Sequence, residues 1–310
     1  MKQYKYLEKL IALLTIFVPT ILIVFGVIVF PYPIQEETVD FLFFPLFLSL
    51  ILLGSGFVLN KERSHKLKIA GWMIFAFYWS TQTSTLYFYE DGDIFNASLC
   101  IVGVYVLFYL AYHEWLSLKR KEWTECLDWV AGTACIAGFI YFGIERTYIG
   151  QWLIEVVAAQ SGWLLNLFTK NIIVFGPNIF YSDKFVVRII FACTAIQSMV
   201  LFIGMILPLK KVDAKRKLCG ILVTLFPIYF LNLIRNAGIT YLVAMNITSL
   251  NLAHNIIGKG GSVIALILLL LIVIKIVPEL FNEILCLTDL PKRKGPIELF
   301  IEKYVWRKKI

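Results

Sequence analysis

Long apolar runs separated by short polar loops dominate the chain. A transmembrane helix needs roughly 20 largely apolar residues to cross a hydrocarbon core of about 30 Å, and about eight such runs are present. They are predicted at residues 7–30, 39–59, 69–89, 94–116, 126–149, 186–207, 218–245 and 261–280. Helices are expected because a backbone in lipid must satisfy its own hydrogen bonds. The pattern therefore predicts an all-α polytopic membrane protein, with a first segment too long to be a removable signal peptide.

The longest interruption of this pattern falls between spans five and six. Residues 151–168 place apolar residues at helical spacing together with Trp152 and Trp163, which predicts a helix lying flat in the outer interface. Two short β-prone runs then flank Gly176, Pro177 and Asn178, a turn signal that allows a short hairpin. The segment is interpreted as an external lid over the last three spans, with a mere linker as the alternative.

These elements define four parts of the chain. Residues 1–144 carry the N-terminal transmembrane helices, of which the fifth ends near residue 149, and residues 145–185 form the external interfacial segment. Residues 186–280 form the catalytic transmembrane helices, and residues 281–310 form a basic cytoplasmic tail. No internal repeat of the transporter kind is found.

Composition and charge fit this map. Hydrophobic residues make up 59% of the chain and charged residues 16%, and the mean hydropathy is +0.78, which excludes an ordinary water-soluble protein. The net charge of +8 comes from basic clusters that fall on one side of an eight-span map: Lys2, Lys5, Lys9, Lys61, Arg63, Lys66, Lys68, Lys119, Arg120, Lys121, Lys210, Lys211, Lys215, Arg216, Lys217, Lys292, Arg293, Lys294, Lys303, Arg307, Lys308 and Lys309. The opposite loops are acidic, with Glu36, Glu37, Glu90, Asp91 and Asp93. The positive-inside rule predicts a protein of the cell membrane with both termini in the cytoplasm. The basic clusters are interpreted as topology signals and anionic-lipid contacts, and no nucleic-acid partner is expected.

The cysteines give no disulfide pattern. They are scattered without CxxC spacing, at Cys100, Cys126, Cys135, Cys193, Cys219 and Cys286. All except Cys193 are predicted to be small apolar packing residues.

Three groups able to do chemistry stand in the apolar C-terminal half: Cys193, Arg235 and His254. An ionisable group in lipid costs free energy, so it usually faces a protein interior or a wet cavity. On the predicted spans Cys193 would lie roughly 10 Å below the outer surface and Arg235 at a similar depth. His254 would precede span eight or open it if that helix starts early. All three are therefore expected to meet in the outer leaflet.

Neighbouring polar residues suggest roles for these groups. Cys193 is expected to act as a thiolate nucleophile, with Gln197 one helical turn on and Ser198 nearby, although a lone buried cysteine is more often a packing residue. His254 is expected to transfer protons, with Asn251 orienting its ring. No metal and no cofactor is expected.

Arg235 is expected to clamp an oxyanion or a substrate carboxylate, with Asn232 one turn earlier to orient it. The alternative is a structural ion pair with Glu145, Glu155 or Asp183.

Three motifs carry a resemblance to a known family. The order A-C-T-x-I-Q-S around Cys193, N-x-x-R ending at Arg235, and A-H-N-x-I-G-x-x-G-S around His254 resembles the archaeosortase/exosortase family, and archaeosortase A most closely. The resemblance covers roughly residues 181–277, with Ala195 where many relatives have glycine. It implies a membrane-embedded cysteine transpeptidase that uses Cys193 as nucleophile, His254 as acid and base, and Arg235 for the oxyanion.

The resemblance also implies the partners. Exported proteins with a C-terminal signal, made of a short motif, a transmembrane helix and a basic cluster, would be the substrates. A membrane phospholipid amine would be the acceptor. The alternatives are a membrane cysteine protease that uses water, a transporter or channel with a structural arginine, and a scaffold or receptor subunit.

Overall fold

The computed structural model describes residues 2–59, 62–88 and 93–304. Predictions made for Lys61, Glu90, Asp91 and the basic residues after 304 lie outside these residues. The chain divides into two compact units, the first formed by Met1–Cys135 and Asn282–Ile310 and the second by Ile136–Phe281. Helices α6 and α11 each contribute to both units.

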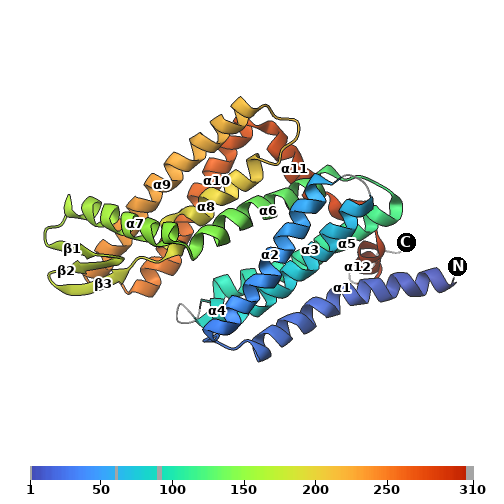
Figure 1. Cartoon of the computed structure of the whole chain (residues 1–310), viewed down its shortest axis with the longest axis horizontal. Coiled ribbons are helices and arrows are strands. Elements are labelled where there is room, and N and C mark those ends of the chain that lie inside the picture. The colour runs from blue at the N-terminus through green and yellow to red at the C-terminus, as the bar shows by residue number, and fades with distance from the viewer. Residues whose placement is uncertain (1, 60–61, 89–92, 305–310) are drawn as a thin grey trace. The chain divides into compact units, whose positions relative to one another are not determined.

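The first unit is a helical bundle. Helix α3 packs against α2 on one side and α5 on the other, and α1 contacts α3, α5 and α12 (Figure 1). Its elements are α1 (Lys2–Val29), α2 (Glu36–Val58), α3 (Glu62–Thr81), α4 (Thr83–Phe88), α5 (Ile94–Arg120), the start of α6 (Glu125–Glu145), the end of α11 (Pro278–Thr288), the 3-10 helix η3 (Leu290–Arg293) and α12 (Pro296–Tyr304).

The second unit holds a small sheet and the C-terminal hydrophobic helices. Its elements are the end of α6, α7 (Tyr148–Asn166), β1 (Ile172–Phe175), β2 (Asn178–Tyr181), β3 (Lys184–Arg188), the 3-10 helix η1 (Phe191–Thr194), α8 (Ile196–Ile206), α9 (Ala214–Ala244), the π-helix η2 (Leu252–Gly258), α10 (Lys259–Ile276) and the start of α11. The three strands are antiparallel in the order β1-β2-β3. Helix α7 packs on β1, η1 and α9.

The predicted hairpin is confirmed, and a third strand extends it. Gly176, with φ +54°, turns the chain between β1 and β2, and Ser182 and Asp183, both with positive φ, turn it between β2 and β3. Asn166 ties the end of α7 to β1, because its side chain bonds both the N–H and the C=O of Ile172. A Cβ on Gly162 would clash with the side chain of Val174, so a glycine lets α7 approach the sheet closely.

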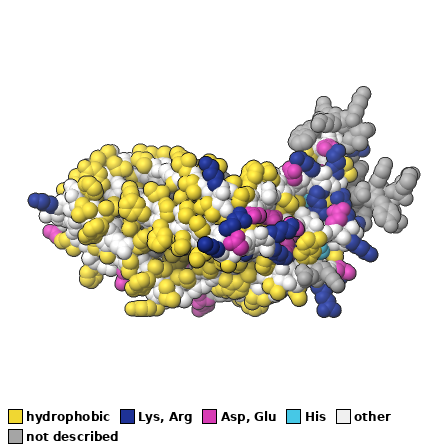
Figure 2. All heavy atoms as spheres, turned by 90° about the horizontal axis from the view of Figure 1, so that it is seen from above, with side chains coloured by type: hydrophobic (Ala, Val, Ile, Leu, Met, Phe, Trp, Pro, Cys, Tyr) yellow, Lys and Arg dark blue, Asp and Glu magenta, His cyan; other side chains and the backbone are white. Residues whose placement is uncertain are grey.

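The membrane class is supported, whereas the number of spans stays a prediction. Among the described residues, five helical stretches are long and apolar enough to cross a bilayer: Glu36–Val58, Ile94–Arg120, Glu125–Glu145, Ala214–Ala244 and Leu252–Ile276. Shorter apolar helices run over Leu13–Val29 and Ile196–Ile206. Figure 2 shows hydrophobic side chains covering much of one face, with charged side chains gathered in a few places.

The prediction of one continuous helix over residues 186–207 is wrong. Strand β3 continues to Arg188, η1 follows, and Ala195 adopts a left-handed conformation with φ 68° before α8 begins. Helix α8 has 11 residues and is roughly 16 Å long, about half of a hydrocarbon core. The β-branched run before Cys193 fits a strand as well as a buried helix, and periodicity alone does not separate the two. Gln197 therefore does not share a helical face with Cys193.

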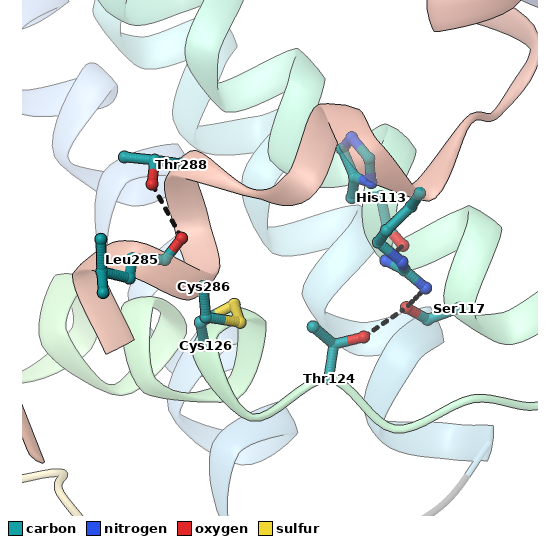
Figure 3. The surroundings of a disulfide bond; sticks show 8 residues. His113, Ser117, Thr124, Cys126, Leu285, Cys286 and Thr288 are labelled. Atoms are coloured by element: carbon teal, nitrogen blue, oxygen red, sulfur yellow. Dashed lines mark hydrogen bonds between the residues drawn. A yellow bond between two sulfur atoms is a disulfide. The ribbon is translucent and has the colours of Figure 1, made fainter. Parts of the chain in front are cut away.

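The prediction that the chain has no disulfide is also wrong. Cys126 at the start of α6 and Cys286 in α11 form a disulfide, while Cys100, Cys135 and Cys219 are free (Figure 3). The two partners are 160 residues apart in sequence, so no local spacing reveals the pair.

The basic tail predicted over residues 281–310 is folded through Tyr304. Glu298 of α12 accepts hydrogen bonds from the hydroxyls of Tyr109 and Tyr112 at 2.8 and 3.1 Å, and the backbone N–H of Gly295 donates to it at 2.8 Å. Arg293 reaches Ser117 and Glu122 at 3.0 and 2.9 Å. These contacts fasten the C-terminal segment to α5.

Two of the three histidines belong to buried ionic contacts of the first unit. His65 pairs with Glu114, which also pairs with Lys68 at 2.9 Å, and Lys68 reaches Asp128 at 3.4 Å. His113 lies 3.3 Å from Glu298. All of these side chains are buried. Lys68 compensates the charges of Glu114 and Asp128, so these contacts join α3 to α5 and α6, and the contact of His113 with Glu298 joins α5 to α12.

Candidate active site

A cavity of about 320 Å³ lies within the second unit, between α9 and the continuous helix η2–α10, with the start of α8 as a third wall. Its polar lining consists of Ser198, Asn232, Arg235 and Ser262. Small and apolar residues form the rest: Ala195, Ile228, Leu231, Ile234, Gly238, Ile239, Leu242, Ile257, Gly258, Gly261, Ala265, Leu266 and Leu269. An apolar pocket with a few convergent polar groups is the usual form of a ligand site.

Cys193 lies in η1, next to this cavity in the fold, and is 8% exposed. Its side chain belongs to a hydrophobic cluster that also contains Val157 of α7, Ile179 of β2 and Ala237 of α9. Its backbone N–H donates to the carbonyl of Ile190 at 2.8 Å. Residues 148–188 thus support the cysteine directly, because α7 and the sheet provide much of its surroundings.

The backbone carbonyl of Cys193 is held by two side-chain amides from α9. The Nδ2 atoms of Asn232 and Asn236 donate to this oxygen at 2.8 and 3.0 Å. Both asparagines are buried. Asn232 also lines the cavity, so a single residue links the cysteine to the pocket.

Arg235 lies between these two asparagines on α9 and lines the cavity. Its stem passes close to Gly258: a Cβ added there would lie 3.0 Å from Arg235 Nε, 2.8 Å from Ile239 Cδ1 and 3.3 Å from the carbonyl oxygen of Ala253. A side chain at position 258 would therefore push against the arginine. Gly258 allows the guanidinium group to reach the cavity.

His254 lies in the π-helix η2, one turn before Gly258. The helix that leads into α10 starts early, as one of the two alternatives for His254 predicted, and His254 is half-buried. π-Helical turns are rare and occur frequently at functional sites, where they shift side chains from their ordinary helical direction. Asn251 precedes this turn and is exposed, as is Gln197 on α8.

The predicted residues fall into two groups. Ser198, Asn232 and Arg235 line one cavity, and Asn232 joins Cys193 to it. Among the described residues, neither Cys193 nor His254 forms part of the lining. Asn236 was not singled out from the sequence, although a second asparagine four residues after Asn232 on an apolar helix marks the same face. Within the described part of the chain no cluster of three His, Cys, Asp or Glu side chains is arranged to hold a metal ion.

Comparison with known proteins gives one match. The model of a family described as transmembrane exosortase matches residues 36–273, a range that includes most of both units and contains Cys193, Arg235 and His254. No curated protein and no solved structure matches the chain.

Proposed function

Because the chain belongs to the transmembrane exosortase family, we propose that it is a membrane-embedded cysteine transpeptidase, most like archaeosortase A. It cleaves the C-terminal sorting signal of exported surface proteins near the outer leaflet and transfers the new C-terminus to a lipid amine. The family itself implies a cysteine-type peptidase or transpeptidase in a membrane. The observation that carries the finer proposal is that α9 bonds the backbone of Cys193 and also presents Arg235 to a cavity.

The proposed reaction has two half-reactions. The thiolate of Cys193 attacks the peptide carbonyl carbon, and the guanidinium of Arg235 stabilises the oxyanion that develops. His254 donates a proton to the leaving amine as the C–N bond breaks, which leaves a thioester. The acceptor amine then attacks the thioester, His254 takes its proton, and the thiolate leaves.

Two structural features favour a thiolate at position 193. Cys193 lies just before the first turn of α8, where the positive end of the helix dipole favours negative charge. Arg235, a cation that does not neutralise itself, lies on the helix that bonds the cysteine backbone. Both act without a metal or a cofactor.

The cavity suits a substrate segment delivered from the bilayer. Leu231, Ile234 and Ile257 belong both to its lining and to the exposed hydrophobic surface, so its rim is apolar where the helices meet lipid. Ser198 and Asn232 supply hydrogen-bonding groups inside. The proposed substrates are exported proteins with a short motif, a transmembrane helix and a basic cluster. We propose that both termini of the enzyme lie in the cytoplasm, as the positive-inside rule predicts, and C-terminal reporter fusions test this orientation.

The direct test compares two cysteine variants in cells that express an exported reporter with such a signal. Cys193→Ala is expected to abolish processing, because it removes the nucleophile. Cys219→Ala is the matched control, because Cys219 is a free, exposed cysteine of α9 and is expected to leave processing unchanged.

The C-terminal mass of the processed reporter identifies the acceptor. An amide-linked lipid supports the transpeptidase, whereas a free carboxylate shows that water resolves the thioester and the protein is a protease. Full processing by Cys193→Ala rejects the cysteine mechanism.

A further inference from the structure

The two asparagines of α9 converge on a single atom. Asn232 and Asn236 are four residues apart, so their side chains lie on one helical face, and both Nδ2 atoms point at the carbonyl oxygen of Cys193. A carbonyl oxygen has two lone pairs, so two donors satisfy it completely. Together with the N–H bond to Ile190, every backbone polar group of Cys193 is paired.

The interruption of helical structure at Ala195 explains why the carbonyl of Cys193 needs side-chain partners. The left-handed conformation of Ala195 separates η1 from α8, and carbonyls at the end of a helix lose their regular partners in the next turn. A buried carbonyl without a partner is costly. The amides therefore hold a short, irregular turn that the helical hydrogen-bond pattern does not fix.

We propose that Asn232 and Asn236 form an amide clamp that positions Cys193 relative to Arg235. Asn232, Arg235 and Asn236 lie within five consecutive positions of α9. One rigid helix therefore determines the positions of both the cysteine backbone and the guanidinium group. At about 100° per residue, Arg235 projects from a face adjacent to that of the asparagines. The inference rests on the proposed function, because it assigns positioning roles for that reaction.

The effect of the clamp should appear in the chemical step. Each neutral hydrogen bond contributes about 1 kcal/mol, which corresponds to a change of about fivefold in the rate of the chemical step. Losing one amide leaves the other in place, whereas losing both leaves a buried carbonyl unpaired, so the double variant should lose more than the product of the single effects. Asn236 is the more diagnostic position, because it does not line the cavity and its side-chain amide bonds the carbonyl of Cys193.

The test uses the full-length protein with Cys100, Cys135 and Cys219 replaced by alanine, which leaves Cys193 as the single free thiol and keeps the disulfide. The variants are Asn232→Leu, Asn236→Leu and the double variant, in which leucine keeps the approximate volume and removes the donor. Thr224→Val is the matched control: Thr224 is a fully buried residue of α9 whose hydroxyl bonds backbone carbonyls of its own helix.

Four quantities are measured: kcat and KM for a reporter peptide, the alkylation rate of Cys193, and thermal stability. Asn236→Leu should lower kcat about fivefold with KM unchanged, and the double variant about 100-fold. Alkylation should become faster, because the released turn exposes a buried thiol. Thr224→Val should lower stability without changing kcat or alkylation.

The proposal is overturned if Asn236→Leu keeps the parent kcat, or if Thr224→Val lowers kcat as much for the same loss of stability. Failure of the proposed function gives a different result. In that case Cys193→Ala processes the reporter fully, and the alkylation rates of the asparagine variants still report whether the clamp holds the cysteine.

Discussion

Gly258→Ala tests how closely the site is fitted around Arg235. The new Cβ would lie 2.8 Å from Ile239 Cδ1 and 3.0 Å from Arg235 Nε, whereas carbon atoms in contact are about 3.5–4.0 Å apart. The neighbours must therefore move by roughly 0.5–1 Å. A misplacement of about 1 Å in a catalytic group can lower a rate about 100-fold, so a shift of half that size predicts a loss of about tenfold in kcat.

Stability should change little in the same variant. Overpacking costs about 1–3 kcal/mol, and replacing glycine by alanine within a helix returns up to about 1 kcal/mol, which leaves a net loss of about 0–2 kcal/mol. The assay combines reporter-processing kinetics with thermal unfolding. Gly260→Ala is the matched control, because a Cβ at Gly260 meets nothing within 4 Å.

A double-mutant cycle isolates the contact with the arginine. If Gly258→Ala acts by displacing Arg235, it should have little further effect on the residual rate of Arg235→Ala. The reasoning is refuted if Gly258→Ala processes the reporter at the parent rate. It is equally refuted if the variant causes the same loss when Arg235 is already alanine.

Three further predictions concern the stability of the fold. Ala195→Gly should raise the free energy of unfolding by up to about 1 kcal/mol, because alanine with φ 68° is strained and glycine is not. An unchanged or lower free energy of unfolding would contradict this. Reduction of the Cys126–Cys286 disulfide should lower stability by up to about 5 kcal/mol, because it closes a loop of 160 residues, and Cys286→Ala should be insensitive to reductant. Burial alone raises the pKa of Glu298, but the nearby His113 ring and the hydrogen bond from Tyr109 outweigh it and lower the pKa from 4.5 to about 2. This group therefore stabilises the fold by up to about 3 kcal/mol above pH 4.5, and the contribution is lost as the pH falls toward 2. Unfolding measured from about pH 6 to about pH 3 should show a smaller decline in Glu298→Gln, and equal declines would remove Glu298 as the cause.

The sequence predicts the long helices well and the irregular turns poorly. Helices α2, α5 and α9 lie within a few residues of their predicted positions, because an apolar run of that length has one stable form in a bilayer. The run before Cys193 is short and β-branched, and its strand depends on pairing with β2. The helices after residue 280 depend on contacts with α5 and on the disulfide, which are distant in sequence.

The site shows the same division between local and distant information. The three motifs indicate which residues carry chemistry, and the position of Asn232 one turn before Arg235 indicates that both belong to the site. The hydrogen bond from Asn236 to Cys193 joins residues 43 apart and depends on the left-handed turn at Ala195. In the sequence Gly258 cannot be distinguished from the neighbouring glycines. Its close approach to Arg235, which Gly260 does not share, is evident only in the structure.

The central claim is that Cys193 forms a thioester with the substrate. The most direct measurement is mass spectrometry of the protein mixed with a sorting-signal peptide in the membrane and quenched with acid during a single turnover. An adduct with the mass of the acyl segment is predicted on the peptide that contains Cys193, and no adduct is predicted in Cys193→Ala. Absence of any adduct together with normal processing by Cys193→Ala would contradict the account.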